Sequence, residues 1–529
     1  MERLWSRAFI SGKPPDETIS SAVYQQLNMM HKWSDISMLV AARDTPHFSK
    51  APPRSDARLL QICVVAAGLY WSILYVAIGL EYELQLFGDG SIFSYSIAVE
   101  DSWVFHWHNI VNRVFVYLFS YVPAETYVEI TKDPYGGIVI YGLLFFGAQL
   151  FGLIATWVID RSTGQVFVTY ACGSTACLCP LIFGFPTEVW MAHALFWPAL
   201  ALCHYAPRGI GGGVAVFVAL LGLAFTHEGA LIFVIAILAT LLPRGSRDAA
   251  FMRAASAFLA VISIWALVKV MFPPDGYFAG VFDRAALHVF DLGILNCDLA
   301  RLLFGTIAIY CLVCYLLSRL TPTRAPAYGV LLVTALLATY WLWFDHALHA
   351  QNRYYMRTVL LVVTPLLGAL AAGYALRAEN QLPRIIPILS RLMSTFATKV
   401  MARALVGALV LVALVHAVET LKFVAAWAHY KAAVRELAMG VGSDPALGDP
   451  QFVSSTRLND NLYRLSWSST TPFLSVLVAQ EFAPSRLVLD KAANYFWITC
   501  QTATESELEQ RAIPAAGRRL VRLHACLHR

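Results

Sequence analysis

Asp89 is the residue of this sequence best suited to chemistry, because it follows the first long apolar run and has a glycine on each side. Flanking glycines let the backbone turn sharply and let a ligand approach closely. A partly desolvated carboxylate there has a raised pKa and can act as a general base on a hydroxyl. Asp-Gly-Ser is also typical of a helix start, where the Asp side chain caps the first turn. The sequence leaves both interpretations open.

Two other polar groups interrupt apolar sequence. His227 and Glu228 stand between two short apolar runs, and a charge at mid-membrane costs about 2.5–3.5 kcal/mol on insertion scales. Glu228 is therefore predicted to face a polar cavity, where it binds a ligand or pairs with an arginine. Arg353 and Arg357 are four residues apart and share a helix face, which suits them to clamp a phosphate. The alternative is a pair of arginines that snorkel at the membrane rim.

The stretch 103–122 repeats apolar residues at helical spacing, with His106 and Arg113 on its opposite side. It is predicted to be an amphipathic helix in the membrane interface, whose polar side lines a substrate cleft or is simply solvated. Glu100 and Asp101 are an adjacent pair suited to a divalent cation or to sugar hydroxyls. A solvated pair or a helix N-cap is the interpretation that we favour for them.

The composition is that of a multi-pass membrane protein. Of 529 residues, 58% are hydrophobic and 14% charged, whereas soluble domains carry about 25% charged residues. The net charge of +5 is small, so the basic residues are interpreted as topology signals and not as a nucleic-acid surface. Eleven apolar runs are predicted to be membrane helices: 59–80, 137–158, 165–183, 188–204, 211–225, 229–242, 252–272, 299–318, 326–344, 358–376 and 404–418.

The distribution of basic residues orients these helices. Segment 1–58 carries eight Lys and Arg, whereas loop 81–136 carries two against eight carboxylates. The N-terminus is therefore predicted in the cytoplasm and loop 81–136 outside. Only a hairpin of two separate helices over 211–242 keeps the later basic clusters inside. This topology places Asp89, Glu228 and Arg353 at the same outer surface.

The predicted fold is an all-α polytopic membrane protein with about eleven transmembrane helices and a small α/β domain outside. Its parts are a cytoplasmic segment 1–58, a transmembrane domain 59–418 and an extracytoplasmic domain 419–529. The last part is predicted from an amphipathic helix, Val418–Met439, followed by strand-like runs at Phe473–Val478, Arg486–Asp490 and Tyr495–Thr499.

With these features the chain resembles the GT-C superfamily of integral-membrane glycosyltransferases, which use sugars linked to lipid phosphates. The resemblance rests on Asp89 after the first helix, on the predicted helix 103–122, and on Asn-Arg353-Tyr-Tyr before a helix with Pro365. It covers about residues 59–420 and implies that Asp89 is the catalytic base and Arg353 the lipid-phosphate contact. The paired acidic motif usual in the family is missing here, since Gly90 follows Asp89.

The expected function is inverting transfer of a sugar from a polyprenyl-phosphate donor to a hydroxyl of a lipid or glycan acceptor. The reaction would occur at the outer face of a bacterial inner membrane, with the C-terminus in the periplasm and with His227 or Glu228 orienting sugar or acceptor. It needs no redox cofactor; a divalent cation is the one candidate, and no nucleic acid is expected as a partner. The alternative is a transporter or flippase for a lipid-linked or anionic solute that binds in the broken segment 211–242.

Overall fold

The computed structural model describes residues 55–100, 111–273, 279–280, 283, 298–343, 350–379, 398–440, 451–459, 462, 464–466, 470–489 and 520. These residues belong to one compact unit, Ser55–Arg529. The predicted site residues Asp101 and His106, the run 495–499 and nearly all of segment 1–58 lie outside the described residues. The backbone of Arg353 is described, but its side chain is not.

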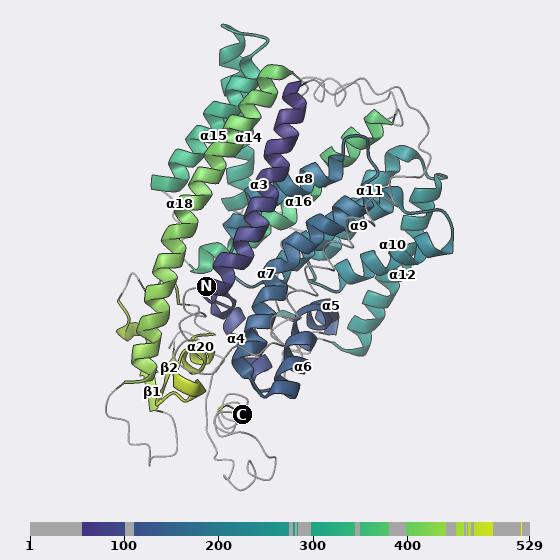
Figure 1. The fold of residues 1–529 in the computed structure, drawn as a ribbon. Coiled ribbons are helices and arrows are strands. Elements are labelled where there is room, and N and C mark those ends of the chain that lie inside the picture. Colours follow the sequence, from purple (N-terminus) through teal and green to yellow (C-terminus); the bar gives the residue numbers. More distant parts are fainter. Residues whose placement is uncertain are drawn as a thin grey trace, which may run out of the picture. The chain divides into compact units, whose positions relative to one another are not determined.

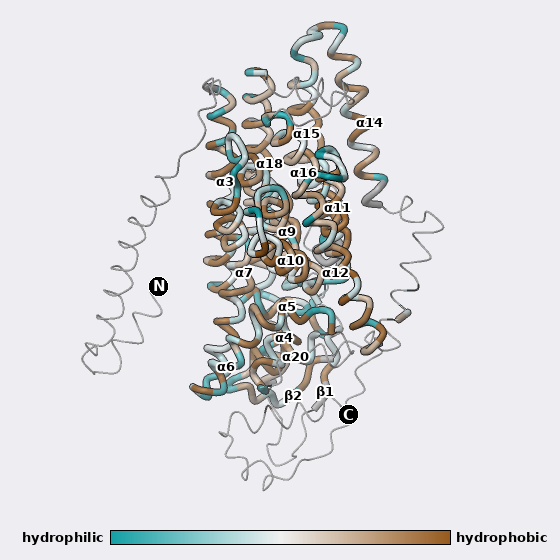
Figure 2. The backbone as a smooth tube through the Cα atoms, turned by 90° about the vertical axis from the view of Figure 1, so that its right-hand side faces the viewer, coloured by the Kyte–Doolittle hydropathy of each residue, from teal (hydrophilic) through white to brown (hydrophobic). Residues whose placement is uncertain are grey.

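The chain is a multi-pass integral membrane protein built of α-helices. Within the described residues, seven helices are long and apolar enough to cross a membrane. They are α3 (Ser55–Glu81), α7 (Pro134–Ile159), α12 (Ala249–Met271), α14 (Asp298–Ser318), α15 (Ala325–Trp343), α16 (Ala350–Ala378) and α18 (Lys399–Ala438). Apolar residues predominate along these helices, and hydrophilic residues are more frequent where the chain turns from one helix to the next (Figure 2).

Four shorter helices lie among the long ones: α8 (Val166–Leu178), α9 (Glu188–Tyr205), α10 (Ile210–Ala224) and α11 (Ala230–Leu241). Each of the eleven apolar runs therefore forms a helix. The predicted break within 211–242 is confirmed, since α10 and α11 are separate helices joined by the loop 225–229. The single turns η5 (Cys179–Leu181) and η6 (Leu242–Arg244) extend α8 and α11.

Small residues let the helices of the core approach closely. A Cβ on Gly152 of α7 would lie 2.3 Å from the Ala194 carbonyl oxygen of α9, and one on Gly68 of α3 would lie 2.5 Å from the Cys172 Cα of α8. Such contacts are the usual means of helix packing in membranes, where burial of apolar surface drives no association. Helix α9, which carries one residue of the candidate site, is thereby packed closely against α7.

At one end of the bundle the chain forms several short helical elements, and those from Val111 to Thr131 follow one another without a gap (Figure 1). They are η1 (Leu84–Leu86), α4 (Gly90–Ala98), η3 (Val111–Arg113), α5 (Val114–Val116), a π-helical turn η4 (Tyr117–Tyr121) and α6 (Val122–Thr131). The predicted end of the helix at residue 122 is wrong, because Pro123 falls in the first turn of α6, where proline is tolerated. Val116, Tyr121 and Val128 are buried, so this segment is packed into the protein.

The described residues of the C-terminal part form more helix than strand. Helix α18 continues without a break across the predicted domain boundary at 418. Beyond it, β1 (Gln451–Ser454) pairs in parallel with β2 (Arg486–Leu489), and the described chain also forms η9 (Ser455–Arg457), α20 (Thr471–Leu477) and η10 (Gln480–Phe482).

One strand prediction for this region is confirmed and one is wrong. Strand β2 lies within the predicted run 486–490, whereas the run 473–478 is mostly the helix α20. All seven residues of α20 are buried. A short segment that is buried on every side shows little periodicity by which helix and strand could be told apart.

Candidate functional site

The candidate site is centred on Arg113, whose guanidinium bridges two carboxylates. Nη1 donates to Glu188 at 2.6 Å, and Nη2 donates to Glu228 at 3.2 Å. The three side chains are 12%, 4% and 12% exposed. Arginine suits such a bridge because its planar fork presents several donors and its charge is permanent. Carboxylates from two distant parts of the chain therefore meet at one buried cation.

Short-range structure positions each partner. The Phe115 amide donates to the Phe225 carbonyl at 3.1 Å, which joins the segment after Arg113 to the α10–α11 loop. Glu188 is the first residue of α9, where the positive end of the helix dipole favours a carboxylate. The backbone bond thus brings the loop that holds Glu228 close to Arg113, and the start of α9 supplies Glu188.

The loop 225–229 holds His227 and Glu228 in fixed orientations. The Gly229 amide donates to Nδ1 of His227 at 2.9 Å, which leaves the proton of the neutral ring on Nε2. Burial, helped by the charges of Arg113 and Arg357, lowers the pKa of His227 to about 4. The ring is therefore uncharged at neutral pH and contributes a hydrogen-bonding group and no positive charge.

Glu228 remains ionised although it is buried. Burial by itself raises the pKa of this carboxyl, but the positive charge of Arg113 outweighs it, and with Lys269 lowers the pKa to about 2. Lys269 Nζ lies 3.7 Å from Oε1 of Glu228 and 5.7 Å from the centre of the Trp265 ring. Glu228 thus connects cations from two helices.

Arg357 is the fifth charged group of this cluster. It lies one turn before Leu361, whose side chain packs against Gly229, and its charge acts on His227. Three cations (Arg113, Lys269 and Arg357) against two carboxylates (Glu188 and Glu228) give a net charge of +1.

Asp89 lies in a turn that is packed against the segment before Glu188. A Cβ on Gly88 would lie 2.6 Å from the Phe185 ring, and one on Gly90 would lie 2.2 Å from the Gln85 carbonyl oxygen. Gly88 also has a φ of +56°, which favours glycine. The flanking glycines therefore serve close packing and a left-handed turn.

The capping interpretation of Asp89 is wrong, since its half-buried side chain makes no cap hydrogen bond to α4. The carboxylate instead acts electrostatically on Tyr141, as does that of Glu188. Tyr121 packs on Tyr141 with ring centres 5.3 Å apart and is itself close to Glu188 and Arg113. Burial raises the pKa of Tyr121 far above its usual range, so it keeps its proton. Asp89 and Glu188 therefore both act on the same buried tyrosine, Tyr141.

Two buried polar atoms beside the cluster have no hydrogen-bond partner among the described residues. They are Nδ2 of Asn112 and Oγ1 of Thr187, each on a residue that is 1% exposed. They directly precede Arg113 and Glu188 in the sequence. Native proteins satisfy nearly all buried polar groups, so each of these atoms calls for a ligand or a water molecule.

An apolar cavity of about 130 Å³ is lined in part by residues that follow Arg113 and Glu188 on the chain. Its walls include Phe115 and Phe119, which follow Arg113 on the chain and stack with ring centres 6.1 Å apart. Met191 and Leu195 of α9 form another wall, beginning one turn after Glu188. Charged and apolar surfaces thus come from the same two segments.

The structure brings some of the predicted site residues together and separates others. The structure brings together Arg113, His227, Glu228 and Arg357, and it connects Asp89 to them through tyrosines. Glu100 is not part of this group: it is exposed and pairs with Lys132 at 3.3 Å.

The sequence interpretation missed Glu188 and Lys269. Each stands at the end of an apolar run that the predicted topology places on the outer surface. The same end-of-run criterion, applied to every charged residue, would have identified both.

Within the described part of the chain, no three His, Cys, Asp or Glu side chains gather as metal ligands. No protein-family model and no curated protein matches this chain. What the structure establishes is a polytopic helical membrane protein, with a buried cluster of arginine, lysine and carboxylates at one end of its helices.

Proposed function

We propose that this protein is a glycosyltransferase that takes a sugar from a polyprenyl-phosphate donor and transfers it, with inversion, to an acceptor hydroxyl. The observation that carries the proposal is the meeting of Arg113, Glu228 and Lys269, with Arg357 close enough to act on His227, and an apolar cavity lined by residues that follow Arg113 on the chain. A lipid-phosphate sugar has the matching parts, which are a long apolar chain and an anionic head.

The charge of the cluster suits this head group. A polyprenyl-phosphate sugar is a phosphodiester with a single negative charge, and the cluster carries a net +1. Arg113 already donates to two carboxylates, so Lys269 and Arg357 are the proposed phosphate contacts. Arg353, which the sequence resemblance assigns to the phosphate, is the third. As the glycosidic bond breaks, a second negative charge develops on the phosphate, and fixed cations in a buried site stabilise it.

Asp89 is the proposed general base. It would accept the proton of the acceptor hydroxyl as that oxygen attacks the anomeric carbon from the side opposite the phosphate. The influence of both Asp89 and Glu188 on Tyr141 supports a place for this base near the Arg113 cluster. Asn112 and Thr187 supply the unsatisfied polar atoms to orient sugar hydroxyls.

The test is donor cleavage by purified protein in lipid nanodiscs with radiolabelled polyprenyl-phosphate sugars. Asp89→Asn is expected to lower transfer by about 100-fold or more, the usual contribution of a general base. Asp133→Asn is the matched control: Asp133 also follows the first membrane helix, but its carboxylate caps α7 through the Gly136 amide at 3.1 Å. Wild-type turnover in Asp89→Asn would contradict the proposal.

A transporter or flippase for an anionic solute is the second candidate. One observation favours it. At the ends away from the candidate site, α9, α11 and α16 also meet in a polar network, so polar contacts join the same helices at both ends. Transport would appear as protein-dependent movement of a fluorescent polyprenyl-phosphate sugar across liposomes without any loss of its sugar.

A further inference from the structure

We propose that Arg244, Tyr205 and Glu379 are positioning residues for the candidate site, although they lie at the opposite ends of the helices that form it. Helix α9 begins at Glu188 and ends at Tyr205, and α16 carries Arg357 near its start, with Glu379 directly after its end. The chain from Glu228 through α11 leads to Arg244. The proposal does not depend on which reaction the site performs.

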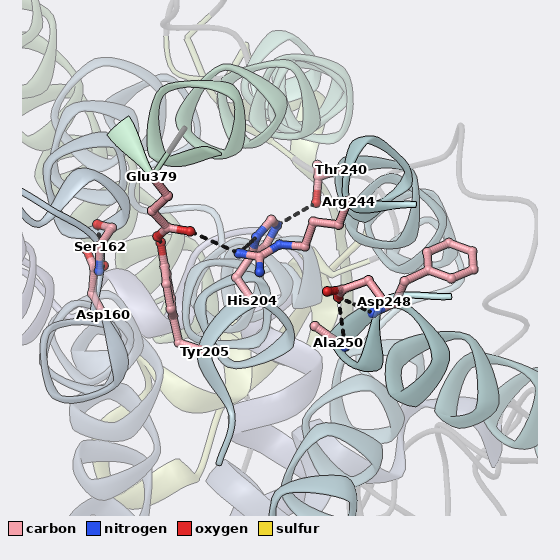
Figure 3. A network of polar contacts seen from close by, with 10 residues as sticks. Asp160, Ser162, His204, Tyr205, Thr240, Arg244, Asp248, Ala250 and Glu379 are labelled. Carbon is pink, nitrogen blue, oxygen red and sulfur yellow. Dashed lines mark hydrogen bonds and ion pairs between the residues drawn. The ribbon is translucent and has the colours of Figure 1, made fainter. Parts of the chain in front are cut away.

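The network joins the far ends of three helices through the Glu379 carboxylate (Figure 3). Tyr205 of α9 donates its hydroxyl proton to Oε1 at 2.5 Å, and Arg244 of η6 donates from Nη2 to Oε2 at 3.5 Å. Arg244 is 10% and Glu379 21% exposed, so the ion pair is mostly shielded from water. One carboxylate therefore fixes α16 to both α9 and the end of α11.

His204 strengthens the joint between α9 and α11. Its Nε2 lies 3.0 Å from Oγ1 of Thr240, and its Nδ1 lies 3.4 Å from Nη2 of Arg244. Thr240 in turn donates to the Ile237 carbonyl at 2.7 Å, which leaves its oxygen to accept from the histidine. These contacts depend on geometry, so they set the register of the helices as well as holding them together.

A small tilt of a helix at the Glu379 end displaces its other end, where the candidate site lies. Helix α9 has 18 residues, and at 1.5 Å per residue it is about 27 Å long. A tilt of about 3° at one end moves the other by roughly 1.4 Å. Such a displacement of Glu188, the first residue of α9, would break its 2.6 Å contact with Arg113. Displacements of about 1 Å are known to cost up to 100-fold in rate when they misplace reacting groups.

The experiment measures the geometry of the site end directly. Spin labels are attached to Leu118→Cys and Thr358→Cys, two exposed positions near Arg113 and Arg357, in the full chain with its native cysteines replaced. The distance between the labels is measured by dipolar EPR in nanodiscs. Glu379→Gln weakens the whole joint, and Tyr205→Phe removes one hydroxyl while preserving packing, so it tests the proposal even if Glu379→Gln fails to fold.

The matched control is Arg253→Leu. Arg253 lies at the same end, but it donates to the Pro207 and Ala206 carbonyls at 2.9 and 3.2 Å, whereas the described partners of the Glu379 carboxylate are Tyr205 and Arg244. We expect Glu379→Gln and Tyr205→Phe to shift or broaden the distance distribution by about 1–2 Å. We expect Arg253→Leu to leave it unchanged, and the exchange Arg244→Glu with Glu379→Arg to restore the wild-type distribution.

Three results would overturn the proposal. The first is an unchanged distance in both test variants, which would reduce the network to a local stabiliser. The second is an equal shift in Arg253→Leu, and the third is failure of the charge exchange to restore the distance. Loss of transferase activity plays no part in these outcomes, so a failure of the proposed function is distinguished from a failure of this inference.

Discussion

At the scale of single residues, Arg113 is the centre of the account. A buried ion cluster adds little net stability over apolar packing, yet removing one partner leaves uncompensated charge and costs about 3–5 kcal/mol. A functional role therefore explains a buried ion cluster better than a gain in stability does. The same reasoning makes the cluster testable without knowledge of a substrate.

Removal of Arg113 should be costly and only partly rescued by lysine. Arg113→Met leaves Glu188 and Glu228 buried without their shared partner, so we expect a loss of about 3–5 kcal/mol in the free energy of unfolding. Arg113→Lys keeps the charge but cannot donate to both carboxylates with fixed geometry. Chemical unfolding in detergent measures both. Equal stability of Arg113→Met and the wild type would contradict the assigned ion cluster.

Glu228 should give stability a specific pH dependence. Its folded pKa of about 2 lies below the ordinary 4.5, so its contribution is fully present above pH 4.5 and is lost as pH falls towards 2. The difference corresponds to roughly 3 kcal/mol. Glu228→Gln should therefore be less stable at neutral pH and should lose less stability on acidification below pH 4.5. Parallel stability curves for the variant and the wild type between pH 2 and 7 would exclude this role.

At the scale of elements, the sequence predicted where helices run and where they break. Each of the eleven predicted runs coincides with a helix, but within the described residues seven helices are long and apolar enough to cross a membrane. The polar pair His227–Glu228 located the turn between α10 and α11. Contacts between elements could not be predicted, because the packing of Gly88 on Phe185 and the bond from Phe115 to Phe225 join segments far apart in the sequence.

The turn that presents Asp89 should tolerate no side chain at Gly90. Gly90→Ala would place its Cβ 2.2 Å from a backbone oxygen, which must move, and we expect a loss of about 1–3 kcal/mol and a displaced Asp89. Gly211→Ala is the control, since no atom outside its own helix lies within 4 Å there. It should be neutral or stabilising by up to about 1 kcal/mol. Thermal unfolding of the two variants measures the difference, and equal midpoints would be inconsistent with the packed turn.

At the scale of the whole molecule, polar groups separate into two sets at opposite ends of the same helices. The positive-inside rule predicted that Asp89, Glu228 and Arg357 share one end, and contacts through Tyr141 and His227 support this grouping. The sequence could not show that Arg113 would bridge two carboxylates, since such pairing depends on packing. Nor could the sequence identify the Glu379 network, because each of its members, taken alone, is a polar residue of a kind common at helix ends.

The orientation of the molecule is a separate prediction. If the site end faces outward, a membrane-impermeant maleimide should label Ile130→Cys on intact cells and should label Ser246→Cys only after the membrane is opened. Both positions are exposed and lie at opposite ends of the bundle, in a background without native cysteines. Labelling of Ser246→Cys alone on intact cells would reverse the topology.

The measurement that tests the central claim most directly compares donor binding and turnover in Asp89→Asn. If Asp89 is the base and the cations hold the phosphate, the variant should bind a polyprenyl-phosphate sugar as tightly as the wild type. Its single-turnover transfer rate should fall by about 100-fold or more. Arg357→Leu should show the converse loss of donor affinity. Wild-type transfer by Asp89→Asn, or no donor binding by the wild-type protein, would contradict the account.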